Sequence, residues 1–265
     1  MHWLVMKFLR FTTTNVFCSK EFIQDLCSYT ENIWSCKMFS KKKYEQFRDE
    51  EIRYRMKASY DNVIELANIH ISKSPAEEQR MFLNYLIKSL LDDVCSSSLT
   101  ESLFRKVNGV LDFPFPFFYY DENGVRYDIF EEKETIVDLS VQNIYVRPWN
   151  NSKLINNLMH IESKEFAYMP DNHKSFYYSD IDLCYVYNGN HSINAGRYFK
   201  KGVIRSKTLN TTKLYPHCKT DGVHWYNSHT NEKLFKTDDF RLAAVYSIAK
   251  MRYEIIQNDY LHYDK

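Results

Sequence analysis

The sequence predicts an α+β protein in which a helical N-terminal part packs on a mixed-sheet domain. Three observations favour this fold class. Apolar residues recur at helical spacing through residues 19–108, strands and turns dominate after Leu111, and neither an internal repeat nor a low-complexity linker separates the two parts. We therefore expect a helical region over residues 1–110 and an α+β domain over 111–265 that ends in a helix.

The N-terminal part is expected to contain several helices. Apolar side chains between residues 22 and 34 follow helical spacing, and the charged segment 42–69 is a further helix. Ser74-Pro75-Ala76-Glu77 has the form of a capping box with proline at the first helical position, so a helix should begin there and run through residue 90. Thr100 should begin another helix that ends at 108–109.

Turn and strand signals follow from Leu111. Two prolines make the segment 113–118 extended, and Asp121-Glu122-Asn123-Gly124 predicts a hairpin turn. The remaining expected elements are one strand or a strand pair over 136–146, a helix over 150–161, strands over 185–187 and 203–209, a hairpin within 223–235, and a last helix capped by Thr237 or Asp238 whose buried face holds Phe240, Ala243, Ala244, Ser247, Ile248 and Met251.

Composition limits the class of protein. With 265 residues and 44% hydrophobic side chains the chain can bury a core, and a net charge of +1 argues against a general polyanion binder. The apolar start is short and is broken by Lys7 and Arg10, so we expect neither a signal peptide nor a membrane partner. The cysteines form no C-x-x-C pair, and reduced thiols in a soluble, cytoplasmic protein are expected for Cys18, Cys27, Cys36, Cys95, Cys184 and Cys218.

Glycine and positive charge concentrate in one stretch of the chain. Four of the six glycines are Gly189, Gly196, Gly202 and Gly222. No acid occurs from 183 to 220, where the cations are Arg197, Lys200, Lys201, Arg205, Lys207, Lys213 and Lys219. We expect these residues to form one concave wall that suits an anion. The alternative is a solvated basic face with ordinary loop glycines.

The loop Asn188-Gly189-Asn190-His191-Ser192 is the strongest candidate site. It follows an expected strand and opens an expected helix, whose free backbone N–H groups and dipole attract anions. His191 would donate to a phosphate or act as a general acid–base, and Asn190 and Ser192 would donate further hydrogen bonds. The alternative is that Asn190 and Ser192 cap the helix and that His191 is a packing residue.

The order of elements around this loop adds a resemblance. A strand over 136–144 runs into Arg147-Pro148-Trp149-Asn150 and a short helix, and the Gly189 loop precedes a helix and a strand that begins at 202–204. This order resembles the ParB/sulfiredoxin-like superfamily. The resemblance implies a mixed-sheet domain whose glycine loop holds nucleotide phosphates. The loop also looks like that of an uncharacterised bacterial family, which supplies no activity.

The chain departs from that superfamily at three places. Sulfiredoxins have a catalytic cysteine where Asn190 stands, so sulfinic-acid reduction is not expected. Both sulfiredoxins and ParB proteins have an arginine where Ser192 stands, so phosphate contacts are expected instead from Arg197, Lys200 or Lys201. The arginine that follows the proline-asparagine segment in the family has no clear counterpart, and Lys153 is the nearest cation.

Two other groups of residues bear on chemistry. His217, His224 and His229, with Cys218, match no zinc spacing, so we expect no metal site there. Asp182 would act as a base or Mg²⁺ ligand if it lay near the loop, and otherwise it is a turn residue of the segment 179–182.

Two hypotheses for function follow. The first is an enzyme acting on a phosphate bond by nucleotide hydrolysis, phosphoryl transfer or phosphodiester cleavage, with Mg²⁺ bound together with a nucleotide. Its catalytic residues would be His191, Asn190 and Asp182, and its ligand-binding residues Asn188, Gly189, Ser192, Arg197, Lys200 and Lys201. The second is a non-catalytic, nucleotide-dependent binding module or a DNA-associated regulator. Catalysis requires an acid or base near His191, whereas binding does not.

Overall fold

The computed structural model describes residues 41–104, 109 and 111–263, and the fold is mixed α+β, as the sequence predicts. The chain forms two compact units, Met1–Ile52 and Arg53–Lys265. Only residues 41–52 of the first unit are described, and they are helical. The helix expected over 22–34, Asn108 and the thiols of Cys18, Cys27 and Cys36 lie outside the described residues.

Two long helices begin the described chain, α3 (Lys41–Ile71) and α4 (Ala76–Phe104). The start near Ser74 is confirmed, and Gln79 supplies a polar contact there, since its Nε2 donates to the carbonyls of Ile71 and Ser74 at 2.8 and 2.6 Å. The separate helix expected to begin at Thr100 was wrong. Thr100 lies within α4, where its hydroxyl donates to carbonyls one turn earlier instead of capping a new helix.

The central sheet has five strands in the order β3 (Phe130–Asp138), β7 (Val203–Leu209), β5 (Lys174–Tyr178), β6 (Leu183–Asn188) and β4 (Asn143–Tyr145). It is mixed, because β3–β7 and β5–β6 are antiparallel whereas β5–β7 and β4–β6 are parallel. The segment 136–146 is neither one strand nor a hairpin pair. Asp138 accepts hydrogen bonds from the backbone and hydroxyl of Ser140, which turns the chain, and β3 and β4 lie at opposite edges of the sheet.

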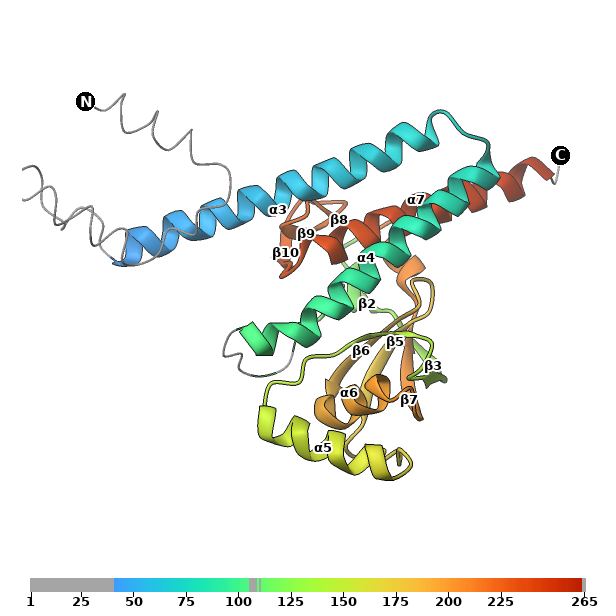
Figure 1. The fold of residues 1–265 in the computed structure, drawn as a ribbon. Coiled ribbons are helices and arrows are strands. Elements are labelled where there is room, and N and C mark those ends of the chain that lie inside the picture. Colours follow the sequence, from blue (N-terminus) through green and yellow to red (C-terminus); the bar gives the residue numbers. More distant parts are fainter. Residues whose placement is uncertain (1–40, 105–108, 110, 264–265) are drawn as a thin grey trace, which may run out of the picture. The chain divides into compact units, whose positions relative to one another are not determined.

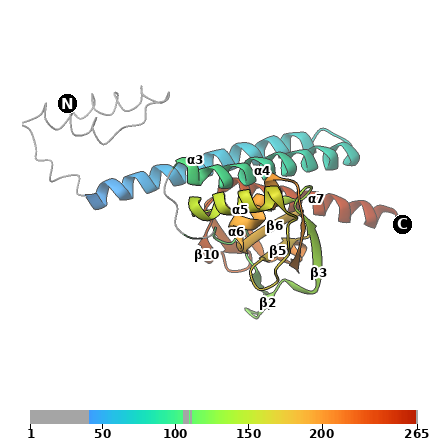
Figure 2. The ribbon, with the colours of Figure 1, turned by 60° about the horizontal axis from the view of Figure 1, so that its bottom comes forward.

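Helices cover both faces of this sheet within the second unit (Figures 1 and 2). On one face lie α5 (Asn151–Ser163) and α6 (Asn190–Tyr198), and Ile193 of α6 packs with Val137, Val186 and Ile204. On the other face lie α4 and α7 (Phe240–Tyr263). Burying each such aliphatic side chain contributes about 1.5–3 kcal/mol, so the two layers hold the sheet from both sides.

The described helices α3 and α4 share their core with the rest of the second unit. Leu83 and Leu91 of α4 are completely buried in the same cluster as Leu183 of the sheet and Val245 of α7. The chain does change from helices to strands after α4, but the hydrophobic core contains residues from both sides of this boundary. The compact units divide at Ile52–Arg53.

Short strands form two further sheets. The expected hairpin at 121–124 joins β1 (Phe118–Tyr120) to β2 (Arg126–Asp128). The expected hairpin within 223–235 consists of β9 (His224–Asn227) and β10 (Lys233–Lys236). The 3₁₀ helix η2 (Thr211–Leu214) leads to β8 (Cys218–Thr220), which pairs with β9 to complete a three-stranded sheet.

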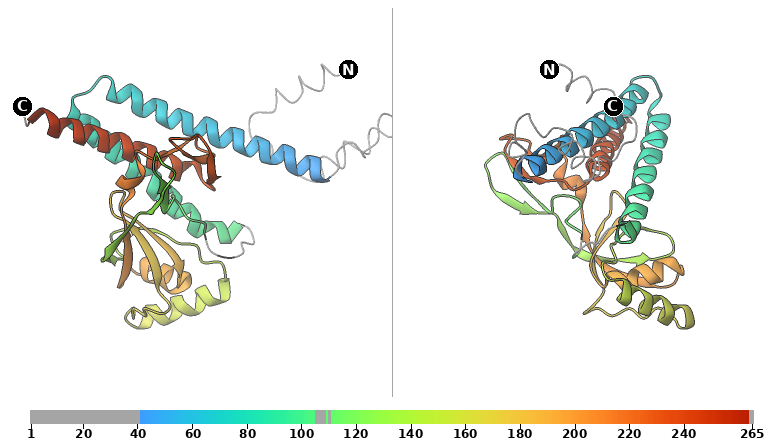
Figure 3. Two further views of the ribbon diagram at one scale, coloured as in Figure 1. Left: turned by 180° about the vertical axis from the view of Figure 1, so that it is seen from behind. Right: turned by 60° about the vertical axis from the view of Figure 1, so that its left-hand side comes forward.

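The last helix, α7, is capped one or two residues later than expected. Neither Thr237 nor Asp238 is the cap, because the Asp239 carboxylate accepts the backbone N–H of Arg241 at 2.9 Å. Ala243, Ala244 and Ile248 are completely buried on the expected face, whereas Phe240, Ser247 and Met251 are half-buried. Figure 3 shows α7 running beside α4. In the described part of the chain, no helix is long and apolar enough to cross a membrane.

Candidate functional site

Gly189 connects β6 to α6 and determines the shape of the candidate loop. Its φ is 79°, which favours glycine, and it is the N-cap of α6. A Cβ at this position would lie 2.7 Å from Cδ2 of His173 and 2.9 Å from the carbonyl of Asn172. Glycine is therefore required twice, for the backbone conformation and for the close approach of the segment that precedes β5.

His173 stabilises the loop through hydrogen bonds of both ring nitrogens. Its Nδ1 accepts the backbone N–H of Met169 at 3.0 Å, so Nε2 carries the proton and donates to Oγ of Ser192 at 2.8 Å. The Ser192 hydroxyl in turn donates to the carbonyl of Gly189 at 3.1 Å. Burial lowers the pKa of His173, which keeps this neutral arrangement. The Ser192 hydroxyl hydrogen expected to reach a ligand is therefore used inside the loop.

His191 joins the starts of two helices. Its Nε2 accepts the backbone N–H of Asn150 at 3.0 Å, and the Asn150 side chain caps α5 by accepting the N–H of Lys153 at 2.9 Å. Because Nε2 is an acceptor, the proton of the neutral ring is on Nδ1, which bonds none of the described residues. Burial and then the charge of Lys153 lower the pKa of His191, and Trp149 packs edge-on against the ring at 5.3 Å.

The electrostatics around this junction are positive. Neither α5 nor α6 has an acid in its first turn, and each helix start carries about half a positive charge from its dipole. Lys153 is exposed and lies 5.3 Å from the centre of the Trp149 ring. Asn190 is only 3% exposed, and its Oδ1 has no hydrogen-bond partner among the residues that the structure describes. We call the region formed by Trp149, Asn150, Lys153 and residues 189–192 the paired-helix site.

Residues 35–258 match the family of unknown function DUF6710. The chain belongs to this family. No curated protein and no solved structure matches the chain. The range matched to DUF6710 includes the whole paired-helix site and the five-stranded sheet.

Three cations of this DUF6710 protein do not reach the loop. Arg197 lies in the last turn of α6, where a helix rise of 1.5 Å per residue separates it from Gly189 by roughly 12 Å, and Lys200 and Lys201 follow the end of the helix. Lys201 donates to the carbonyls of Ile161 and Glu162 at 3.3 and 3.4 Å. The expectation that these cations replace the family arginine is therefore not met, and Lys153 is the cation at the site.

Asp182 lies at the opposite end of β6 from Gly189. Six strand residues separate them by roughly 20 Å. Its carboxylate accepts the hydroxyl of Tyr177 at 2.7 Å, and its carbonyl accepts the side-chain amide of Asn143 at 3.1 Å. Asp182 has a φ of 57° and is a turn residue, so it is neither a base nor a Mg²⁺ ligand for the loop.

The glycines and cations do not form one wall. Strand alternation sends Arg205 and Lys207 to the face of β7 opposite Ile204, which packs beneath α6. Gly196 and Gly202 are both close to the ring of Phe166, and the other clustered glycine, Gly222, contacts Tyr60. Packing thus accounts for three of the glycines, and only Gly189 belongs to the site. Asn188 is the exposed last residue of β6.

The histidines of the C-terminal hairpin separate into two places. His217 Nδ1 and His229 Nε2 lie 2.8 Å apart, whereas His224 lines a different cavity. Among the residues that the structure describes, no three His, Cys, Asp or Glu side chains are grouped as metal ligands require. Cys95, Cys184 and Cys218 are free and buried.

Sequence reasoning missed His173 and the contact made by Asn150. Asn150 carried a usable signal, because asparagine is one of the preferred residues at a helix N-cap. His173 carried none, since its role depends on the pairing of β5 with β6, which brings residues 172–173 beside Gly189.

Proposed function

We propose that this DUF6710 protein binds a phosphate-bearing ligand at the paired-helix site. The observation that carries the proposal is the 3.0 Å hydrogen bond from Asn150 N to His191 Nε2, which joins the positive ends of α5 and α6. A single helix start is a weak anion site. Two helix starts and Lys153, with no acid in either first turn, make a stronger one.

The donors at this site suit phosphate oxygens. The backbone N–H groups of Asn190, His191 and Ser192 stand in the first turn of α6, where no intrahelical acceptor exists for them. His191 adds Nδ1–H, and Lys153 adds a mobile charge that approaches from α5. The order β6, loop, α6, β7 also fits the ParB/sulfiredoxin-like resemblance, which we retain as part of this proposal with a nucleotide or DNA phosphate as the ligand class.

Binding is favoured over catalysis. A phosphate-transfer or hydrolytic site needs a base or a metal-binding acid beside the phosphate, and Asp182 lies too far away to serve. Nε2 of His191 is occupied by Asn150, and Asn190 Oδ1 is buried. We therefore propose a binding module, with any Mg²⁺ arriving on the nucleotide. A reducing compartment such as the cytoplasm suits the buried free thiols.

Thermal unfolding with added ligand tests this proposal. ATP, ADP and a short DNA strand, each with and without Mg²⁺, should raise the melting temperature of the full chain, since only the folded state binds them. His191→Gln and Lys153→Ala should weaken binding at least tenfold, and added salt should weaken it further. Lys200→Ala, an exposed cation at the other end of α6, is the matched control and should bind as the original protein does.

Two results would reject the proposal. One is that none of these ligands shifts the melting temperature of the unaltered protein. The other is that Lys200→Ala weakens binding as much as His191→Gln and Lys153→Ala do. Release of free phosphate from ATP, abolished in His191→Gln, would show that the site is catalytic and would replace the binding module by an enzyme.

A further inference from the structure

An open pocket lies between α3 and the β8–β9–β10 sheet, whose elements are neighbours in Figure 1. Its volume is about 260 Å³. We call it the α3–β9 pocket, and it is lined by Arg53, Tyr54, Lys57, Asp221, Val223, His224, Tyr226 and Lys233. It shares no residue with the paired-helix site.

Tyr60 holds α3 against this sheet. It is only 8% exposed, its hydroxyl donates to the carbonyl of Thr220 at 3.2 Å, and it shares a 2.9 Å hydrogen bond with Ser247. Gly222 permits this approach, because a Cβ there would lie 2.5 Å from Cβ of Tyr60. Lys57 and Arg53 lie one and two turns before Tyr60 on the same side of the helix, so the anchor places both cations over β9.

Three of the eight lining residues are cations. Arg53 and Lys57 approach from α3 and Lys233 from β10. Neither Arg53 nor Lys233 forms an ion pair within the described chain, and Lys57 pairs only with Asp61 across an exposed turn of α3. Three positively charged side chains from two elements thus line one pocket, and the lining contains fewer acids than cations. The resulting positive electrostatic potential suits an anion.

Asp221 is the acid in the lining, and its oxygens are already occupied. They accept the backbone N–H groups of Val223 and His224 at 2.9 and 2.7 Å and the hydroxyl of Tyr226 at 2.7 Å. Burial would raise the pKa of Asp221, but these hydrogen bonds outweigh it and lower the pKa. Asp221 therefore shapes the turn that positions His224 and Tyr226, and it does not neutralise the cations.

His224 is the histidine among the lining residues. Burial lowers its pKa, and Lys233, Arg53 and the neighbouring Lys236 lower it further, whereas Asp221 opposes them. Lys57, Tyr54 and Tyr226 are the other titratable groups that line the cavity. An anion among these cations would cancel the repulsion, and His224 would then bind a proton and become a further positive donor.

We propose that the α3–β9 pocket binds a small phosphomonoester. Its volume accommodates a phosphate and a small attached group, Arg53 and Lys233 supply charge-assisted hydrogen bonds, and the Tyr54 and Tyr226 rings form the apolar walls. The proposal goes beyond the function proposed for the paired-helix site, because it assigns a second ligand to residues of α3 and of the β9–β10 hairpin.

Calorimetric titration of the full chain tests this proposal with ribose 5-phosphate and inorganic phosphate as probes. The unaltered protein should bind both. Arg53→Gln and Lys233→Gln should each weaken binding at least fivefold, and the double variant should weaken it more than either. Lys88→Gln, an exposed cation of α4, is the matched control and should leave binding unchanged. Unchanged melting temperatures of the variants would establish that they are folded, since Tyr60 is left in place.

Titration with inorganic sulfate at several pH values tests the role of His224, because sulfate itself does not change its charge between pH 5.5 and 7.5. Its binding should strengthen as pH falls through this range, and His224→Gln should remove that dependence while retaining binding at pH 7.5. Four results would overturn the proposal. The first is that the unaltered protein binds neither phosphate probe, and the second is that Lys233→Gln and Lys88→Gln bind the probes equally well. The third is that sulfate binding still depends on pH in His224→Gln. The fourth is that His191→Gln loses ribose 5-phosphate binding whereas Lys233→Gln keeps it. The last would assign the ligand to the paired-helix site instead.

Discussion

At the scale of single residues, Gly189 and His173 act together. Gly189 turns the chain from β6 into α6, and the absence of a Cβ lets the His173 ring lie directly beneath it. The ring then donates to Ser192 and fixes the first turn of α6. The free N–H groups of the paired-helix site therefore have defined directions because one small residue and one buried neutral histidine fit against each other.

Replacing Gly189 by alanine tests this fit. Gly124 is a matched control, because its φ of 78° is nearly the same as the 79° of Gly189, but nothing lies within 4 Å of the place its Cβ would take. We expect Gly124→Ala to lower the free energy of unfolding by about 1 kcal/mol through backbone strain alone. Gly189→Ala should cost at least about 1–2 kcal/mol more, since His173 must move. Urea unfolding measures both, and equal losses would refute the close contact.

The three described thiols give a second prediction at this scale. Burial raises the pKa of Cys95 and Cys218 to about 12 and that of Cys184 to about 11. Since the thiolate is the reactive form, none of the three should react with a thiol reagent in the folded protein at pH 8. All three should react within the dead time after denaturation. Mass spectrometry of peptides locates the label, and rapid labelling of any of them in the native state would contradict their burial.

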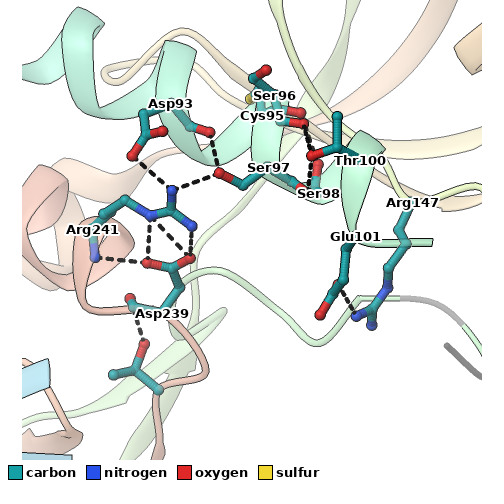
Figure 4. Close-up of polar contacts among 11 residues, drawn as sticks. Asp93, Cys95, Ser96, Ser97, Ser98, Thr100, Glu101, Arg147, Asp239 and Arg241 are labelled. Atoms are coloured by element: carbon teal, nitrogen blue, oxygen red, sulfur yellow. Dashed lines mark hydrogen bonds and ion pairs between the residues drawn. The ribbon is translucent and has the colours of Figure 1, made fainter. Parts of the chain in front are cut away.

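At the scale of elements, Arg241 connects the start of α7 to α4. Figure 4 shows its guanidinium between Asp239, which caps its own helix, and Asp93 and Ser97 of α4. The side chain is 18% exposed, so this fork of hydrogen bonds is largely screened from water. Partly buried, bidentate contacts of this kind stabilise more than surface pairs do. Arg241 therefore helps to align α7 with α4.

The exchange Arg241→Met keeps the side-chain volume but removes these hydrogen bonds. We expect a loss of about 2–3 kcal/mol in the free energy of unfolding, because the Asp239 carboxylate is left with fewer partners. The control is Lys88→Met, which breaks the 3.1 Å exposed pair with Asp92 and should change stability by less than about 0.5 kcal/mol. Similar effects of the two exchanges in chemical unfolding would show that Arg241 is only a surface residue.

At the scale of the whole second unit, the central sheet is buried between two helical layers, and burial affects the titration of four histidines in the unit. The pKa values of His173, His191, His217 and His224 are all lowered, in each case first by burial. Each histidine binds a proton less readily in the folded state than in the unfolded state. The unfolded state therefore gains protons first as pH falls below about 6.5, and this favours unfolding.

We consequently expect the free energy of unfolding to be steady above about pH 7.5 and to decrease as pH falls from about 6.5 to 5. Asp238 acts in the opposite sense, because burial and Asp112 raise its pKa to about 6, but four histidines outnumber it. Urea unfolding at several pH values measures the slope. His173→Gln should reduce that slope, because it removes one of the four rings whose pKa is lowered. A stability that does not change between pH 7.5 and 5 would contradict the burial of these rings.

The sequence by itself determined the features that depend on neighbouring residues. Helical spacing located α3, α5 and α7, the glycine turn located the start of α6, and Asp121 to Gly124 located a hairpin, because local backbone preferences and short-range hydrogen bonds decide these elements. The same reasoning located the loop at Gly189 as the candidate site.

Only the tertiary structure decided which residues meet. Strand order sent β3 and β4 to opposite edges, placed Asp182 at the wrong end of β6 and brought His173 under Gly189. The packing of α5 against α6 paired Asn150 with His191, forty-one positions apart in the chain. Such contacts depend on which apolar faces are buried together, a choice made over the whole core, and no local pattern of residues encodes it.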